Sequence, residues 1–405
     1  MKFCVSQYNA KGLSQTSKLP DFVYLCDSTL RDGEQANVKY TSDEKIEIAR
    51  RLDDAGISEI QVGSLRSPQY IAEAKAICAL GLRARIEIMT RATMPAWRDE
   101  VTQAVDFGAD VVHSMLPLSH WLRGAYGQEL DDEALLERAA AVIGTAHERG
   151  AKFVNISLLD ATRTGEEYLK KTVQTLALAG AERICLADTA GCATPAGITY
   201  LVERCGNWLD EVKKRDDVIL RLHLHNDFGL VMANSAAAVS AGANTLDCCV
   251  NGTGKRAGNA DTVQLAVTLK ALYGIDTGVD LTKLFELAKF VEKTAGVPIP
   301  ANMPFTGELA FADDSESHIR GLMKNTFAFQ AIDPEKDWGN PRRILIGKNS
   351  GLSALELKLS QLGLPLLTKE NMQQLLDQCH ARAQELPKGA WLTDEEIAKL
   401  SAEIA

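Results

Sequence analysis

Short apolar runs rich in β-branched residues recur along the first two thirds of the chain, and a longer amphipathic segment follows each. The runs cover residues 22–27, 58–63, 84–90, 110–116, 152–160, 183–188, 218–225 and 244–250. Apolar runs of this length predict buried β-strands, and the longer segments predict helices. The segment 41–56, for example, opens with the potential N-caps Ser42 and Asp43 and stops at Gly56.

The number and spacing of these units predict the fold class. Eight strand–helix units in about 250 residues are typical of an α/β protein with a (β/α)8 TIM barrel. A doubly wound open sheet is the alternative. That fold usually has fewer strands and a Gly-rich nucleotide-binding turn after the first of them. Here the first strand runs instead into DSTLRDGEQ at 27–35.

The strand–helix pattern ends near Tyr273, so we expect residues 1–275 to form a TIM-barrel catalytic domain. The Pro-rich stretch VPIPANMPFTG at 297–307 cannot continue a helix and is typical of a linker. The segments that follow have helical patterns. We therefore expect residues 276–405 to form a linker and a smaller, mostly helical C-terminal subdomain that acts as a lid or in dimerisation.

Composition narrows the classes of partner and the compartment. The 405 residues carry a formal net charge of −10, which disfavours nucleic acid as a partner because phosphate binding needs a surplus of Lys and Arg. Nine scattered cysteines without a CxxC pair indicate reduced intracellular thiols. No stretch approaches the roughly 20 apolar residues of a membrane span, and the N-terminal segment has no apolar core of signal-peptide length. We expect a cytoplasmic protein without a membrane partner.

Polar residues at the predicted strand ends are the candidates for chemistry, because barrel enzymes place their active sites at the C-terminal ends of the strands. Asp32 follows the first strand, His223 and His225 end the seventh, and Asn259 lies in the Gly-rich loop after the eighth. Alternation along a strand directs both histidines to the same face. Strands one, seven and eight are neighbours in a closed barrel, so these side chains can converge.

The chemistry of this residue set predicts a metal site. Two imidazoles, a carboxylate and an amide oxygen suit a divalent ion such as Mg, Mn, Zn or Co that keeps open positions for substrate. Such an ion chelates the carboxylate and carbonyl of a 2-oxo acid and acts as a Lewis acid. Arg31, next to Asp32, is placed to neutralise the oxygen that becomes negative when the carbonyl is attacked.

Several motifs carry a resemblance to a known superfamily. DSTLRDGEQ (27–35), LHLHNDFG (222–229) and GKRAGNA (254–260) resemble the signatures of the DRE-TIM metallolyases. LLDATRT (158–164), LADTAGCATP (186–195) and the tail segments 307–318 and 344–351 are similar to those of its Claisen-condensing branch, the homocitrate, 2-isopropylmalate and citramalate synthases. The resemblance implies condensation of acetyl-CoA with a metal-bound 2-oxo acid, followed by hydrolysis of the thioester.

The resemblance also implies a role for each matching position. Asp32, His223, His225 and Asn259 would bind the divalent metal, and Arg31 would be catalytic. Gln35 would lie near the substrate, and Arg163 and Thr189 would contact the carboxylates of the 2-oxo acid. His318 would be a second catalytic residue, matching a tail histidine that reaches a neighbouring subunit's active site and assists proton transfer, which implies a homodimer.

Departures from the family pattern concern positions near the substrate. Gln61 and Leu159 stand where the family usually has glutamates, and Lys255 replaces the glutamate of a Gly-Glu-Arg segment. These changes suggest an atypical electrophile, such as a phosphonate-bearing 2-oxo acid. Two other functions stay open. A metal-dependent lyase or aldolase cleaving a 3-hydroxy acid or its CoA ester is less favoured because such lyases generally lack the post-barrel extension. A non-catalytic binding protein is disfavoured because every ligand position is present.

Overall fold

The computed structural model describes residues 1–13, 19–34, 38–125 and 130–404 of the chain. They form two compact units. One comprises Gln7–Pro298, and the other comprises Met1–Ser6 together with the described residues from Ile299 onward. The division follows the helix α11 (Leu284–Ala295), so the first unit includes a helix that lies beyond residue 275.

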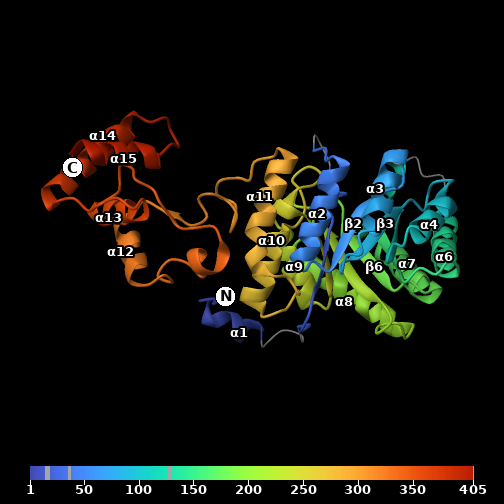
Figure 1. Ribbon diagram of the computed structural model, residues 1–405. Coiled ribbons are helices and arrows are strands. Elements are labelled where there is room, and N and C mark those ends of the chain that lie inside the picture. Colours follow the sequence, from blue (N-terminus) through green and yellow to red (C-terminus); the bar gives the residue numbers. More distant parts are fainter. Residues whose placement is uncertain (14–18, 35–37, 126–129, 405) are drawn as a thin grey trace. The chain divides into compact units, whose positions relative to one another are not determined.

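The larger unit contains a closed barrel of eight parallel strands, which confirms the predicted fold class (Figure 1). The barrel closes where β1 pairs with β8, with Tyr24 opposite Thr245 and Asp27 opposite Cys248. The strands are β1 (Tyr24–Asp27), β2 (Glu59–Ser64), β3 (Arg85–Thr90), β4 (Val111–Pro117), β5 (Phe153–Leu159), β6 (Arg183–Asp188), β7 (Ile219–Leu224) and β8 (Thr245–Cys248). Every predicted apolar run overlaps one of these strands, and β2 and β4 extend one residue beyond their runs.

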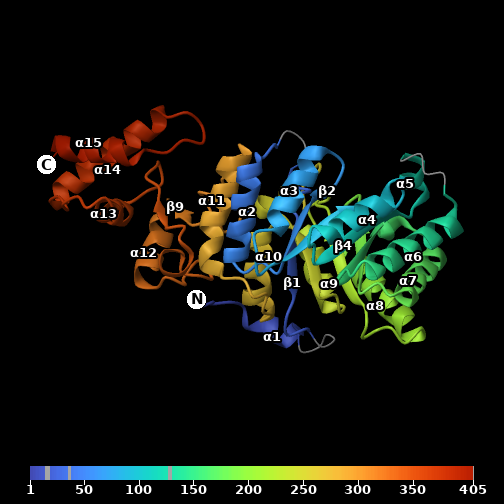
Figure 2. The same ribbon diagram turned by 45° about the vertical axis from the view of Figure 1, so that its right-hand side comes forward.

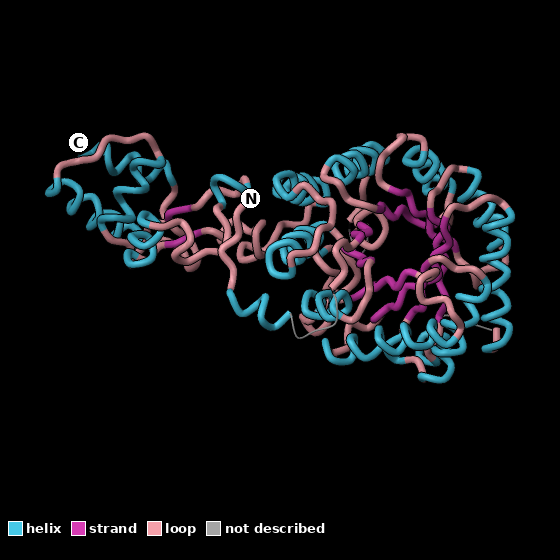
Figure 3. The backbone as a smooth tube through the Cα atoms, turned by 90° about the horizontal axis from the view of Figure 1, so that it is seen from below, coloured by secondary structure: helices cyan, strands magenta, loops and turns pink. Residues whose placement is uncertain are grey.

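Helices surround the strands, as the end view in Figure 3 shows. They are α2 (Ser42–Asp54), α3 (Pro68–Cys78), α4 (Trp97–Asp106), α5 (His120–Ala125), α6 (Asp132–Glu148), α7 (Glu166–Ala179), α8 (Pro195–Glu211), α9 (Val231–Ser240) and α10 (Thr262–Thr268), with α1 (Gln7–Leu13) preceding the barrel. The N-cap of α2 is Thr41, one residue before the predicted caps. Its hydroxyl accepts from the Glu44 backbone N–H, and the Glu44 carboxylate accepts in return from the Thr41 N–H.

The barrel interior below the strand ends is charged. Glu59, Glu87, Asp247, Arg183 and Arg221 are all at most 2% exposed. The Arg183 guanidinium pairs with Glu59, and Arg221 lies between Glu87 and Asp247. Buried charges are tolerated only when they are paired, because each ion loses its hydration. This layer replaces the branched aliphatic residues that usually fill such a barrel.

The smaller unit is mostly helical, with one short two-stranded sheet. Its elements are β9 (Ala312–Asp313), α12 (Glu316–Lys324), β10 (Arg343–Ile344), α13 (Leu352–Gln361), α14 (Lys369–Glu385) and α15 (Asp394–Ile404). α14 and α15 lie side by side in Figures 1 and 2. Leu355, Leu359, Leu375 and Ile397 belong to its apolar core and are fully buried. None of the helices in the described ranges has the length and apolar character needed to cross a membrane.

Candidate active site

The turn after β1 directs two charged side chains into the barrel mouth. The backbone N–H groups of Arg31, Asp32 and Gly33 all donate to the Ser28 carbonyl. A side chain at Gly33 would place a Cβ 2.4 Å from the Thr29 carbonyl oxygen, so the turn requires glycine there. Asp27 holds the base of the turn by accepting from the Thr29 N–H, 2.8 Å away.

Asp32 is nearly fully buried and surrounded by positive charge. The Arg31 guanidinium contacts both of its oxygens, at 2.8 and 2.9 Å, and His223 Nε2 lies 3.2 Å from Oδ2. Lys255 Nζ lies 3.9 Å from Oδ1. Burial alone would raise the pKa of Asp32. Arg31, followed by His223 and Lys255, outweighs burial and holds this pKa below its ordinary value, so Asp32 is an anion at neutral pH.

His223, His225 and Asn259, the other predicted metal ligands, lie in and just after β7 and in the loop after β8. The two imidazole centroids are 5.0 Å apart, and the backbones of His225 and Asn259 form an isolated antiparallel bridge. His225 Nδ1 and both amide atoms of Asn259 are buried without a hydrogen-bond partner among the described residues. Burial, with a smaller effect of His223, lowers the pKa of His225 to about 3 and keeps its imidazole neutral. Unpaired buried polar atoms are costly, so these donors would gain from binding a ligand.

A closed ring of polar contacts supports these residues from below. Arg31 donates to the side-chain oxygen Oε1 of Gln61, and Nε2 of Gln61 donates to Glu87. Arg221 bridges Glu87 and Asp247, and Asp247 Oδ2 lies 2.8 Å from His223 Nδ1. His223 then returns to Asp32 and Arg31. A branch runs from Gln61 to His113 Nδ1 at 3.0 Å and from His113 Nε2 to Ser157 Oγ at 2.7 Å.

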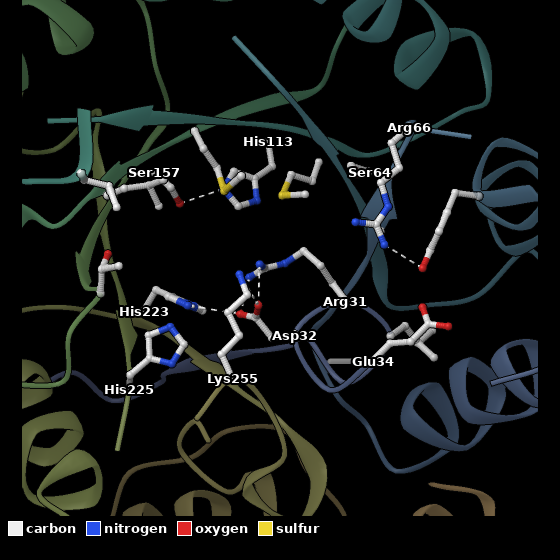
Figure 4. Close-up of a pocket in the computed structure, with 18 of the residues that line it drawn as sticks. Arg31, Asp32, Glu34, Ser64, Arg66, His113, Ser157, His223, His225 and Lys255 are labelled. Atoms are coloured by element: carbon white, nitrogen blue, oxygen red, sulfur yellow. Dashed lines mark hydrogen bonds and ion pairs between the residues drawn. The ribbon is translucent and has the colours of Figure 1, made fainter. Parts of the chain in front are cut away.

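A cavity of about 330 Å³ opens above this ring. Arg31, Asp32, His223, His225 and Lys255 line one part of it, as Figure 4 shows. Burial lowers the pKa of Lys255, Asp32 opposes that shift, and the neighbouring arginines add to it. The lining also includes the apolar side chains of Met89, Met115, Leu122 and Leu159. The cavity is of a size that fits a small carboxylic acid with part of a second substrate.

The other residues expected from the sequence lie in different places. Thr189 lines the cavity, and its hydroxyl accepts from the Asp160 N–H at 2.8 Å. Arg163 pairs with Asp160 at 2.8 Å and is not among the described residues that line the cavity. Gln35 lies outside the described residues. His318 belongs to the smaller unit, where its Nδ1 lies 3.1 Å from Asp313 Oδ2 and its ring stacks on Phe329.

Sequence reasoning missed several cavity and support residues. His113 and Ser157 line the cavity, and Asp247 holds His223. Each is one of two polar residues in a buried strand, which was a usable signal, because a buried polar side chain needs a partner inside the barrel. Arg66, which also lines the cavity, follows β2 in a loop and gave no such signal.

A second group of potential metal ligands lies inside the barrel. Cys26, Glu59 and Glu87 place one donor atom each within 4.8 Å of one another. Arginines already neutralise both carboxylates, and Arg221 Nη2 also lies 3.0 Å from the Cys26 sulfur. A guanidinium and a divalent cation cannot share this space, since like charges in a buried site repel strongly. The group is better explained as part of the charged barrel interior.

Comparison with known families and proteins extends over both units. Residues 22–291 match the HMGL-like family model, and residues 305–387 match the homocitrate synthase post-HMGL domain-like model. The 2-isopropylmalate synthase of Methanocaldococcus jannaschii is 36% identical over 97% of this chain and 74% of its own length. The (R)-citramalate synthase of the same organism is 34% identical over 94% of the chain and 74% of its own length. The homocitrate synthase AksA of Methanothermobacter thermautotrophicus is 32% identical over 98% and 96%.

Among solved structures, hydroxymethylglutaryl-CoA lyases share the barrel. The Bacillus subtilis lyase aligns with a TM-score of 0.60 and 22% identity over 70% of this chain and 97% of its own. The Pseudomonas aeruginosa lyase aligns with a TM-score of 0.60 and 22% identity over 69% and 95%. At this identity the likeness concerns the fold alone. The two family matches and the similarity to the synthases place this chain in the HMGL-like family, within the Claisen-condensing branch of the DRE-TIM metallolyases.

Proposed function

We propose that this protein is an acyl-CoA:2-oxo acid acyltransferase. The methyl group of acetyl-CoA loses a proton, and its carbon forms a bond to the carbonyl carbon of a 2-oxo acid, whose oxygen becomes a hydroxyl by taking up a proton. Water then hydrolyses the thioester to release CoA. The product is a 2-hydroxy dicarboxylate or tricarboxylate of the homocitrate or alkylmalate type. The observation that carries this proposal is the placement of Asp32, His223 and His225 beside Arg31 in the lining of one cavity, with Asn259 next to His225 through a backbone bridge.

The donor set fits a divalent metal such as Mg, Mn, Zn or Co. Asp32 is ionised and His225 is neutral, which are the forms that bind metal. The unpaired Nδ1 of His225 and the unpaired amide of Asn259 would gain a partner. When bound, the ion supplies Lewis acidity at the carbonyl of the 2-oxo acid. Asp247 holds the His223 ring by accepting from Nδ1, which leaves Nε2 for the cavity side.

The side chains around this set have separate roles in the proposal. Arg31, fixed by Asp32 and Gln61, stabilises the negative oxygen that forms when the carbonyl is attacked. Lys255 adds positive charge at the same end of the cavity. Thr189 offers its hydroxyl to a carboxylate of the 2-oxo acid. Gln35 and Arg163 remain predicted substrate contacts.

His318 is the proposed proton-transfer residue. Within its own unit it is about half exposed, and its Nδ1 lies 3.1 Å from Asp313 Oδ2. The ring stacks on Phe329 at a centroid distance of 4.1 Å. An imidazole oriented by a carboxylate, with its second nitrogen free to face a substrate, is suited to general acid–base work. We propose that it serves the active site of a second subunit in a homodimer.

The synthase direction is preferred to the lyase for a specific reason. The lyase structures that share the barrel align with about 70% of this chain, whereas the homocitrate synthase post-HMGL domain-like model covers residues 305–387 beyond it. His318 falls in that region. The changed positions Gln61, Leu159 and Lys255 support an acceptor different from those of the standard synthases, with a phosphonate-bearing 2-oxo acid as one example.

Thiol release tests the proposal. The purified protein, loaded in turn with Mg²⁺, Mn²⁺, Zn²⁺ or Co²⁺, is incubated with acetyl-CoA and a panel of 2-oxo acids, and free CoA is measured with a thiol reagent. We expect CoA release that needs metal and one of the acids, with a product whose mass equals that acid plus an acetate unit. CoA-ester cleavage without any acid-dependent thiol release would overturn the synthase assignment in favour of the lyase.

A further inference from the structure

Arg66 is a cationic residue of the cavity that the proposed mechanism does not use. It lies in the loop between β2 and α3 and lines the same cavity as Arg31 and Lys255. Figure 4 shows it beyond Arg31, away from the end where His223 and His225 lie. The chain therefore presents a guanidinium to the cavity at a distance from the proposed metal ligands.

The side chain of Tyr70 contacts this guanidinium, which belongs to an exposed residue. Arg66 Nη2 donates to the Tyr70 hydroxyl at 2.9 Å, and its guanidinium carbon lies 4.6 Å from the centre of the Tyr70 ring. Lys45 Nζ lies 4.5 Å from the centre of the same ring, and the buried Lys45 is itself paired with Glu34 and Glu73. Packing and charge thus fix Tyr70, and through it the position of Arg66.

Gly63 lets Tyr70 approach the strand end. A Cβ at Gly63 would come within 3.1 Å of the Tyr70 ring, closer than ordinary contact. The absence of that atom allows the ring to pack against β2 at the edge of the cavity. The arrangement of Gly63, Tyr70 and Arg66 is a preorganised group, and preorganisation raises the affinity of a charged residue for its ligand.

Among the described residues, no carboxylate neutralises the charge of Arg66. Arg31 pairs with Asp32, and Arg256, another cavity arginine, pairs with Asp227. Unlike these two arginines, Arg66 has no carboxylate of the described residues within 4.0 Å of its guanidinium. Glu34, the other acidic residue of the cavity lining, is committed to Lys45 at 2.8 Å. A free guanidinium beside a cavity whose carboxylates are both paired attracts an anion.

We infer that Arg66 determines substrate specificity by binding a second acid group, a carboxylate or phosphonate, at the far end of the 2-oxo acid. This inference rests on the proposed function. The planar guanidinium can donate two parallel hydrogen bonds to such a group. Met89, Met115, Leu122 and Leu159, which line the same cavity, provide apolar contacts for the carbon chain between the two acid groups.

The test compares acids that differ in the terminal group. Steady-state thiol release is measured for metal-loaded protein with 2-oxoglutarate and phosphonopyruvate, and with the alkyl acids 2-oxobutyrate and 2-oxoisovalerate. The variants are Arg66→Leu, Arg66→Lys and the control Arg149→Leu, which removes one positive charge from an exposed pair with Asp106. Thermal unfolding confirms that each variant folds. Isothermal titration of the diacids into Mn²⁺-loaded protein measures binding without turnover.

We expect the wild type to prefer the acids with a second acid group. Arg66→Leu should lower kcat/KM for them by roughly 10- to 100-fold, the effect of losing hydrogen bonds between charged groups. In this variant kcat/KM for the alkyl acids and the KM for acetyl-CoA should change little. The control variant should have wild-type kinetics with every acid. Arg66→Lys should restore part of the activity, because it keeps the charge and loses the two-pronged geometry.

Other outcomes would overturn the inference. A preference of the wild type for alkyl acids would show that the cavity does not select a second acid group. An equal loss of activity with all acids in Arg66→Leu would show that Arg66 does not bind such a group. A raised KM for acetyl-CoA with an unchanged acid preference would assign Arg66 to the CoA phosphates instead. If no acid supports thiol release, the proposed function fails. The titration then decides on Arg66 separately, since equal diacid affinities of wild type and Arg66→Leu refute its role.

Discussion

Asp247 offers the sharpest test of how the barrel interior supports the candidate site, through the substitution Asp247→Asn. In the native chain one carboxylate oxygen accepts from His223 Nδ1 at 2.8 Å, and the other accepts from the Arg221 guanidinium. Burial alone would raise the pKa of Asp247, but Arg221 and His223 outweigh it and hold this pKa below its ordinary value. Asparagine has one acceptor oxygen, so its NH₂ must face one of these two donors.

The magnitude follows from which contact is lost. If the oxygen stays on Arg221, the His223 ring loses its orienting partner, and metal affinity should fall roughly 10- to 100-fold, as for other changes behind a metal-binding histidine. If it stays on His223, the buried Arg221 loses one of its partners. Removing one member of a buried charge pair costs about 3 kcal/mol of unfolding free energy. Arg221 keeps its pair with Glu87, so the fold should survive either loss.

Two measurements separate these effects. Metal affinity is measured by competition with a chelating dye at a temperature well below the unfolding transition, and the free energy of unfolding is measured by urea titration without metal. The control is Asp106→Asn, since Asp106 is an exposed residue paired with Arg149, and we expect neither quantity to change appreciably. An Asp247→Asn protein with wild-type metal affinity and wild-type stability would refute the reasoning about the ring.

Three further predictions concern the turn glycines, a buried lysine and pH. Gly254→Ala should weaken metal binding at least tenfold in a dye competition assay, because Gly254 has φ +147° and its Cβ would lie 2.1 Å from Asn259 Oδ1; Gly144→Ala, with open space around it, should bind metal normally. Lys45→Met should lower the free energy of unfolding in urea by about 3 kcal/mol, since it leaves Glu34 and Glu73 without their shared cation; an unchanged midpoint would contradict this. Burial raises the pKa of Asp27 from 3.8 to about 6, so the folded state holds that proton more tightly than the unfolded state. Its contribution to stability should therefore decline by roughly 3 kcal/mol as pH rises from about 4 to 6, and Asp27→Asn should flatten the dependence of Tm on pH in that window.

The strands and the proposed metal set could be predicted from the sequence for physical reasons. A buried parallel strand needs a short apolar run, and each of the runs at 22–27 and 183–188, for example, contains the observed strand. The two-residue spacing of His223 and His225 fixes their shared face without knowledge of any partner. Closing the barrel then brings β1, β7 and β8 together, so Asp32 reaches His223.

The partners of the buried charges could not be predicted from the sequence. Arg221 is separated from Glu87 by 134 positions along the chain, and Arg183 from Glu59 by 124. A single charged residue in an apolar strand indicates an interior position but not the residue that neutralises it. The same limit applies to Arg66, whose place in the cavity depends on the packing of Tyr70 from α3. The N-cap of α2 was misplaced by one residue for a different reason. Thr41, Ser42 and Asp43 can all serve as N-caps, and the sequence does not show which of them does.

The ring beneath the candidate site also explains why a neutral residue suits position 61. Gln61 accepts from Arg31 with its oxygen and donates to Glu87 with its amide, so it joins a cation to an anion without adding charge. A glutamate in the same place would put a second carboxylate against Glu87, and one of the two would have to take up a proton. With glutamine, Glu87 stays ionised and pairs fully with Arg221, which in turn binds Asp247. The orientation of Arg31 and that of His223 are therefore set by one connected group of buried charges, so a substitution within the ring should affect stability and the proposed chemistry together.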